Sequence, residues 1–129
     1  MTHLLEDENI DPFQIAQQAA DQIAEKSGVN EHQIALTLGS GWAKAADLLG
    51  ETVSEIPAAD IIGFSKPAVV GHGGTIRSIK LRNDKFALVI GARTHFYENH
   101  GVRAVVHSVR TAAKTGAKVM VLTNGAGGI

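Results

Sequence analysis

The sequence contains no cysteine in its 129 residues, which excludes disulfide frameworks, cysteine-based zinc sites and thiol nucleophiles. It also lacks an excess of charge: 12 lysines and arginines against 13 aspartates and glutamates give a formal net charge of −1. That balance argues against a basic nucleic-acid-binding face. No apolar run approaches the roughly 20 residues that cross a bilayer, and the acidic N-terminus is unlike a secretory signal. We therefore expect one cytoplasmic domain over residues 1–129, with no nucleic-acid or membrane partner.

Glycine, by contrast, is abundant. The chain has 14 glycines in 129 residues, whereas an average usage of about 7% would give about nine. Several glycines directly follow short apolar runs, a pattern typical of strands that end in turns. Asp11 and Pro12 mark the start of a first helix and Gly28 marks its end. The other expected elements are strands at 34–38, 52–56, 75–81, 86–90 and 118–122, a short helix at 42–49 and a last helix from Val102 to Lys114, whose apolar stripe includes Val102 and Val109.

Three of these apolar runs lead into loops of glycine and polar residues: LTLGSG, LVIGARTH and VLTNGAGG. In open α/β sheets, ligands bind outside the carboxyl ends of the strands. If the three strands are parallel and adjacent, Ser40, Arg93, His95 and Gly125 come together at one edge of the sheet. This convergence is the main prediction of the sequence.

The turn Gly39–Ser40–Gly41 can present main-chain amides and a hydroxyl to an oxyanion. It has neither the Walker nor the dinucleotide glycine spacing, and Gly-Ser-Gly turns more often merely join a strand to a helix. Arg93 and His95 are two residues apart, so in an extended segment they project to the same side. A guanidinium fork and an imidazole suit phosphate, although either residue can also be a solvated loop side chain.

The other candidates are less specific. His72, within Gly-His-Gly-Gly, suits either a phosphate-side donor or an ordinary surface loop. The residues from Asn124 to Gly128 can present amides to an anion or a heterocycle, or can simply be flexible. Trp42, Phe64 and Phe96 are expected to be packing residues. The spacing of the polar residues that could ligate a metal fits no H-E-x-x-H pattern, so no metal is expected; these residues are His95, Glu98, His100 and His107.

Four motifs together resemble a known family: GSGW at 39–42, GHGG at 71–74, ARTHFYE at 92–98 and TNGAGG at 123–128. In order and separation they are similar to the trimeric purine nucleoside phosphorylases, particularly the bacterial 6-oxopurine type. The resemblance implies a three-layer αβα fold with a mixed central sheet. It also implies phosphorolysis of inosine- or guanosine-type ribonucleosides to the base and ribose 1-phosphate. Inorganic phosphate would be the co-substrate, with no cofactor, and the family's full-length chain is expected to form a homotrimer.

The resemblance also assigns residues. It implies a phosphate site made by Ser40, His72, Arg93, His95 and the Gly125 amide. It further implies that Tyr97 faces the ribose and that Ala126 and Gly127 line the purine side. These roles rest on the matching motifs.

The sequence departs from the family in two kinds of place. Asn99 and Gly125 replace a common glycine and a common alanine, and asparagine tolerates the left-handed backbone that a glycine would adopt. The family's chains also continue well beyond TNGAGG with further strands and most of the nucleoside pocket. We therefore expect exposed strand edges and little or no activity from this chain alone.

The alternative function is a non-catalytic phosphate- or nucleotide-binding module that needs a partner chain. A dehydrogenase-type domain is not expected, because the sequence lacks the glycine fingerprint of that fold.

Overall fold

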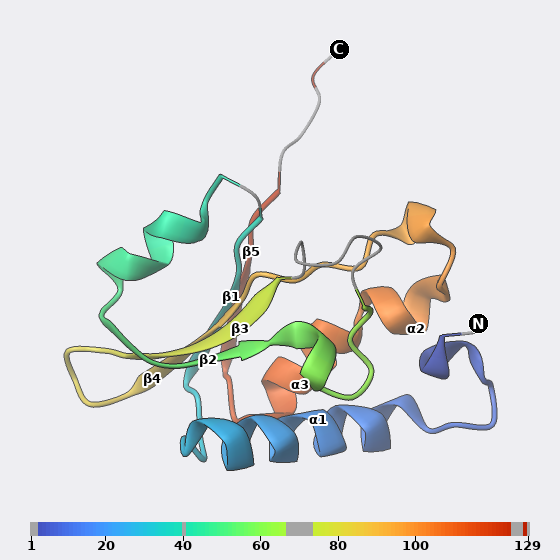
Figure 1. Cartoon of the computed structure of the whole chain (residues 1–129), viewed down its shortest axis with the longest axis horizontal. Coiled ribbons are helices and arrows are strands. Elements are labelled where there is room, and N and C mark those ends of the chain that lie inside the picture. The colour runs from blue at the N-terminus through green and yellow to red at the C-terminus, as the bar shows by residue number, and fades with distance from the viewer. Residues whose placement is uncertain (1–2, 40, 67–73, 125–127, 129) are drawn as a thin grey trace.

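The computed structural model describes residues 3–39, 41–66, 74–124 and 128. It is built on a five-stranded sheet (Figure 1). The strands are β1 (Ile34–Thr37), β2 (Glu51–Pro57), β3 (Thr75–Lys80), β4 (Phe86–Ile90) and β5 (Val119–Leu122). The α-helices are α1 (Pro12–Ser27), α2 (Gly101–Val105) and α3 (His107–Lys114), and the 3₁₀ helices are η1 (Leu4–Glu6), η2 (Ala43–Leu48), η3 (Ala58–Asp60) and η4 (Phe96–Glu98).

The sheet is mixed, as predicted. Its strand order is β2-β3-β4-β1-β5. The strands β4, β1 and β5 are parallel, whereas β2 and β3 join on antiparallel. The expected parallel arrangement of β4, β1 and β5 is therefore confirmed, and β3 pairs with β4 as a hairpin through the turn at residues 81–85.

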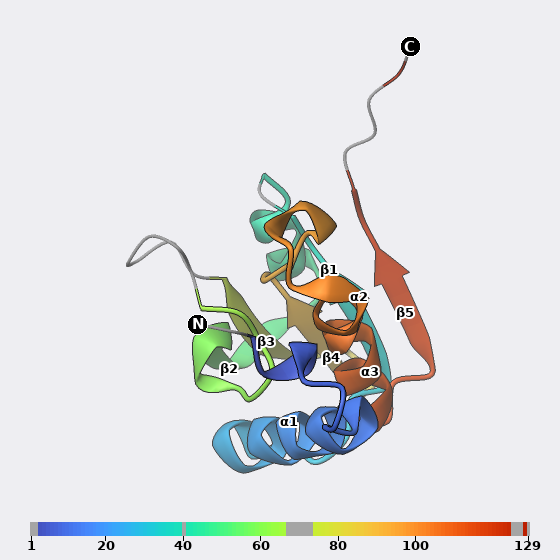
Figure 2. The same cartoon turned by 90° about the vertical axis from the view of Figure 1, so that its right-hand side faces the viewer.

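Helices cover the two faces of the sheet unequally. The helices α1 and α3 lie side by side on one face around Ile23, Ala35, Leu88 and Ala112 (Figure 2). The 3₁₀ helix η2 covers the other face around Ala46, on the side away from α1 (Figure 1). All of β4 from Ala87 to Ile90 is buried, as expected for an apolar run without alternation that is covered on both sides. The short segment expected at 42–49 folds as a 3₁₀ helix.

The first helix begins and ends as its sequence predicts. The Asp11 carboxylate accepts a hydrogen bond from the Phe13 amide at 2.9 Å, which satisfies one of the free amides of the first turn. Gly28 closes the helix with a φ of +74°, a left-handed conformation that suits glycine. The buried face contains Ile15, Ala16, Ala19, Ala20 and Ile23.

The prediction of one continuous last helix with an apolar inward stripe is wrong in two respects. The helix breaks at Val106 into α2 and α3, and two valines of the predicted inward stripe are exposed: Val102 at 61% and Val109 at 38%. The buried residues of α2 and α3 are Ala104, His107, Thr111 and Ala112, of which only Ala112 belongs to the predicted stripe. The two polar residues can be buried because His107 is hydrogen-bonded to the chain at Ile62 and to Thr111.

Two of the three expected packing aromatics are also exposed. Trp42 and Phe96 have exposed fractions of 61% and 69%, whereas Phe64 packs against the core. In addition, β5 pairs with β1 and with no other described strand, and Val119 and Leu122 on it are exposed. The expected exposed edge is therefore found at β5. Among the described residues, no helix combines the length and the apolar character required to cross a bilayer.

Candidate functional site at the carboxyl edge of the sheet

The three parallel strands end at the same level of the sheet. Thr37, the last residue of β1, lies between Ile90 of β4 and Leu122 of β5. The ladder continues for one more residue on each side: the Leu38 amide donates to the Ile90 carbonyl at 3.1 Å, and the Thr123 amide donates to the Thr37 carbonyl at 3.2 Å. The three polar loops thus leave the sheet side by side.

Arg93 links two of these loops directly. Its Nη2 donates a hydrogen bond to the main-chain carbonyl of Thr123, 30 residues later in the chain. Arg93 is otherwise exposed, and a guanidinium carries five N–H donors. Arg93 therefore lies at the edge where the sequence predicts an anion-binding site, and its other N–H groups are available to donate to an anion.

His95 and Tyr97 form a second feature of this edge. Their rings stack with centroids 4.8 Å apart and an angle of 9° between the planes. The Glu98 carboxylate accepts a hydrogen bond from the His95 amide at 2.9 Å, and Asn99 ends the turn with a φ of +62°. The left-handed conformation expected at Asn99 is therefore confirmed.

The remaining predicted site residues lie outside the described part of the chain: Ser40, His72, Gly125, Ala126 and Gly127. Their described neighbours can be placed. Gly39 follows β1, Gly74 precedes β3 and Asn124 follows β5. The structure thus brings the loops of the parallel strands to one edge, while the roles assigned to individual residues stay predictions.

The four possible metal ligands each have a different environment. Glu98 accepts from the His95 amide, His100 lies 3.2 Å from Glu6, and His107 Nε2 donates to the Ile62 carbonyl at 2.9 Å. Within the part of the chain that the structure describes, no three such side chains form a group that could hold a metal.

His107 has a structural environment that the sequence did not reveal. Burial lowers the pKa of His107, and the hydrogen bond to the Ile62 carbonyl opposes this shift only in part. The ring packs edge-on against Phe64 with centroids 4.9 Å apart. A histidine within a helix carries no local signal for such a partner, because Ile62 is 45 residues away.

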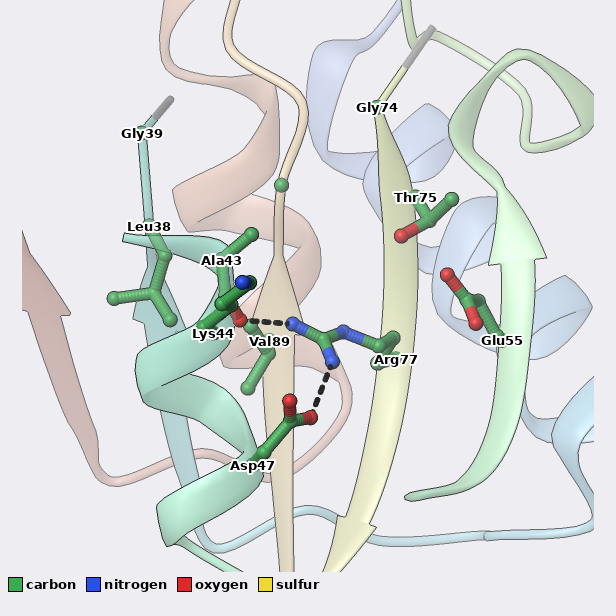
Figure 3. A pocket seen from close by; sticks show the side chains of 11 residues that line it. Leu38, Gly39, Ala43, Lys44, Asp47, Glu55, Gly74, Thr75, Arg77 and Val89 are labelled. Atoms are coloured by element: carbon green, nitrogen blue, oxygen red, sulfur yellow. Dashed lines mark hydrogen bonds and ion pairs between the residues drawn. The ribbon is translucent and has the colours of Figure 1, made fainter. Parts of the chain in front are cut away.

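A pocket of about 420 Å³ opens beside this edge, between η2 and the sheet (Figure 3). Arg77 crosses it and bonds to Asp47 at 3.2 Å and to the Ala43 carbonyl at 2.8 Å. Lys44 and Glu55 also line the pocket, so its charges are balanced. None of the predicted site residues that the structure describes lines it. Arg77 was missed by the sequence analysis, and it ties η2, which follows the Gly39 turn, to β3.

Comparison with known proteins shows strong similarity to part of one group of enzymes. A purine nucleoside phosphorylase from Cellulomonas sp is 57% identical over 129 residues, which is 97% of this chain and 46% of that protein. The chain is homologous to the purine nucleoside phosphorylases. No protein-family model matches the sequence.

Solved phosphorylase structures share the fold. A purine nucleoside phosphorylase in complex with ribose 1-phosphate matches 92% of this chain with a TM-score of 0.77 and 27% identity. The Schistosoma mansoni phosphorylase in complex with inosine matches 94% with a TM-score of 0.76 and 27% identity. The chain spans under half the length of each protein: 43% and 41% of these chains. The expected resemblance, and its restriction to part of the family chain, are both confirmed.

Proposed function

We propose that this chain supplies the phosphate subsite of a purine nucleoside phosphorylase. The observation that carries the proposal is the Arg93–Thr123 hydrogen bond, which joins two of the three predicted anion-binding loops at the carboxyl edge. The homology to a phosphorylase over 97% of the chain and the ribose 1-phosphate complex of a structural relative support it.

In the proposed site, Arg93 holds phosphate through its guanidinium fork, because this group offers paired donors at fixed spacing. In this proposal the Ser40 hydroxyl, the His95 ring and the Gly125 amide add neutral or switchable donors, and His72 would lie beside them. These donors neutralise and orient the dianion, so that one phosphate oxygen faces the sugar. The chain's contribution is positioning and electrostatics.

The proposed reaction is the cleavage of an inosine- or guanosine-type ribonucleoside by inorganic phosphate. A phosphate oxygen forms a bond to the anomeric carbon while the bond from that carbon to the purine nitrogen breaks. The products are ribose 1-phosphate and the purine, which takes up a proton. Tyr97 would contact the ribose, and Ala126 and Gly127 would line the purine side.

The whole activity needs more than this chain, because the chain spans about half of its curated relatives. We therefore expect weak or no phosphorolysis from the 129 residues alone. A homotrimeric assembly of the full-length protein, a cytoplasmic location and the absence of a cofactor other than the co-substrate phosphate belong to the same proposal.

Complementation tests this proposal. The chain would be co-expressed with a polypeptide that carries the part of the Cellulomonas phosphorylase beyond the region of similarity, and inosine phosphorolysis would be followed by hypoxanthine release. Turnover by the mixture, and its loss when Arg93→Ala is used, supports the proposal. A stable mixture that binds phosphate without turnover would instead favour the non-catalytic binding module. Among the described strands β5 pairs only with β1, and its Val119 and Leu122 are exposed; this observation supports a partner chain in both cases.

A further inference from the structure

The segment from Ile61 to Ser65 is anchored to two helices although it forms no strand or helix itself. The Ile62 amide donates to the Gln22 side chain of α1 at 2.8 Å. The Ile62 carbonyl accepts from His107 Nε2 of α3 at 2.9 Å. Both main-chain polar groups of one residue are thus held by side chains that are 40 and 45 residues away. These two hydrogen bonds hold the Ile61–Ser65 segment in place against α1 and α3.

Gly63 and Phe64 pack this segment against His107 of α3. Gly63 has a φ of +83°, and a Cβ added there would lie 2.4 Å from His107 Nε2. The Phe64 ring meets the same imidazole edge-on. Because the imidazole fills the space next to the main chain, the segment cannot move toward α3.

At the end of this anchored segment, Ser65 contacts the loop that follows β4. Its Oγ lies 3.0 Å from Thr94 Oγ1, in a half-buried hydrogen bond between residues 29 apart. Thr94 stands between Arg93 and His95, in a stretch that belongs to no helix or strand. The start of that stretch is held by the Gly91 amide, which donates to the Thr75 carbonyl at 2.8 Å, and its end is held by Glu98.

We propose that Ser65 is a positioning residue for the candidate phosphate site, an inference that rests on the proposed function. Ser65 holds Thr94 on the anchored segment, and this fixes the main chain that carries Arg93 and His95. It acts through Thr94, and the inference requires no contact of either hydroxyl with phosphate. A site keeps its affinity only while its supporting hydrogen bonds hold the ligand-binding groups in place.

The test compares Ser65→Ala with the unmodified chain by two measurements. The first is amide hydrogen exchange at residues 93–95, followed by NMR. The second is titration with inorganic phosphate at constant ionic strength. Loss of one half-buried neutral hydrogen bond predicts faster exchange at these amides and phosphate binding weaker by about five-fold. Ser65→Thr, which keeps a hydroxyl, should restore much of both values.

Two further variants control the test. Ser108→Ala removes a hydroxyl from α3 beside the same small cavity that Thr94 lines, and it should change neither measurement. Thr94→Val removes the other partner, so it should reproduce the effect of Ser65→Ala. The double variant should be no worse than either single variant, because both remove one bond.

The outcomes separate the two proposals. If the unmodified chain does not respond to phosphate, the proposed function fails, and the exchange data still show whether Ser65 holds the Arg93 loop. If the unmodified chain binds phosphate and Ser65→Ala binds equally well, the positioning role is wrong and the proposed function stands. If Ser65→Ala does not fold, the comparison of Thr94→Val with Ser108→Ala decides in the same way.

Discussion

The guanidinium of Arg93, which follows β4, donates a hydrogen bond to the main-chain carbonyl of Thr123, which follows β5. The two strands are not neighbours, since β1 lies between them. Arg93 thus spans the end of β1, where the Gly39 turn begins. This contact places a permanent positive charge over the region where the sequence predicts an anion.

The first prediction concerns this charge. Arg93→Lys keeps the positive charge but loses the paired donors, so phosphate binding should weaken by about ten-fold. Titration with phosphate, followed by NMR, measures the effect. Arg82→Lys is the control, because Arg82 is exposed in the turn between β3 and β4 at the opposite end of β4. Equal affinities for the two variants would contradict the assignment of Arg93.

The second prediction concerns Gly63. Gly63→Ala should lower the free energy of unfolding by about 2–4 kcal/mol, because it combines a left-handed backbone with a clash against the buried His107 ring. Gly28→Ala is the matched control: Gly28 has a φ of +74° but no atom within 4 Å of the added Cβ, so about 1 kcal/mol is expected. Urea unfolding of both variants measures the difference. Similar losses would show that His107 does not restrict this segment.

The third prediction concerns pH and His32. This fully buried residue forms a 2.8 Å hydrogen bond with Ser78, and burial lowers the pKa of His32 from 6.5 to about 4. The fold therefore favours the neutral ring, and the unfolded chain takes up a proton first. The contribution of His32 to the free energy of unfolding should be fully present above pH 6.5. It should be lost as the pH decreases toward 4, which lowers the stability by at most about 3 kcal/mol.

Urea unfolding at several pH values tests this dependence. His32→Gln should be less stable near pH 7 but should show a flatter profile between pH 6.5 and 4. Some slope should persist in the variant, because burial also lowers the pKa of His107. An unchanged slope would assign the pH dependence to other groups.

The fourth prediction concerns the free edge of β5. Val119 and Leu122 are exposed on this edge strand at 54% and 58%, and unpaired edges with apolar side chains favour association. Val119→Lys should therefore reduce self-association in sedimentation experiments. Leu48→Lys replaces a residue that is 89% exposed on η2, away from the edge, and should have little effect. Equal reductions would point to general surface hydrophobicity instead.

The parts of the fold that depend on local pattern could be predicted from the sequence. The run from Phe86 to Ile90 is apolar without alternation, and it forms a strand that is buried on both faces. Asp11 and Gly28 mark the ends of α1 because capping uses adjacent residues. The parallel strands then bring the loops of Gly39, Arg93 and Thr123 to one edge, which the sequence analysis expected.

The parts that depend on distant partners could not be predicted. The sequence offered Val102 and Val109 as a core stripe, but periodicity does not say which face finds a neighbour. His107 can be buried because the Ile62 carbonyl accepts a hydrogen bond from its Nε2, and the Ser65–Thr94 hydrogen bond joins two residues that no sequence pattern singles out. Neither partner is visible in a window of neighbouring residues.

A phosphate titration of the unmodified chain, followed at its main-chain amides by NMR, tests the central claim most directly. Residues 39, 41, 93–95 and 123–124 should shift together with one dissociation constant, and sodium chloride at equal ionic strength should leave them unchanged. If these signals do not move, or if only one of the three loops responds, the three strand ends do not form a common phosphate site.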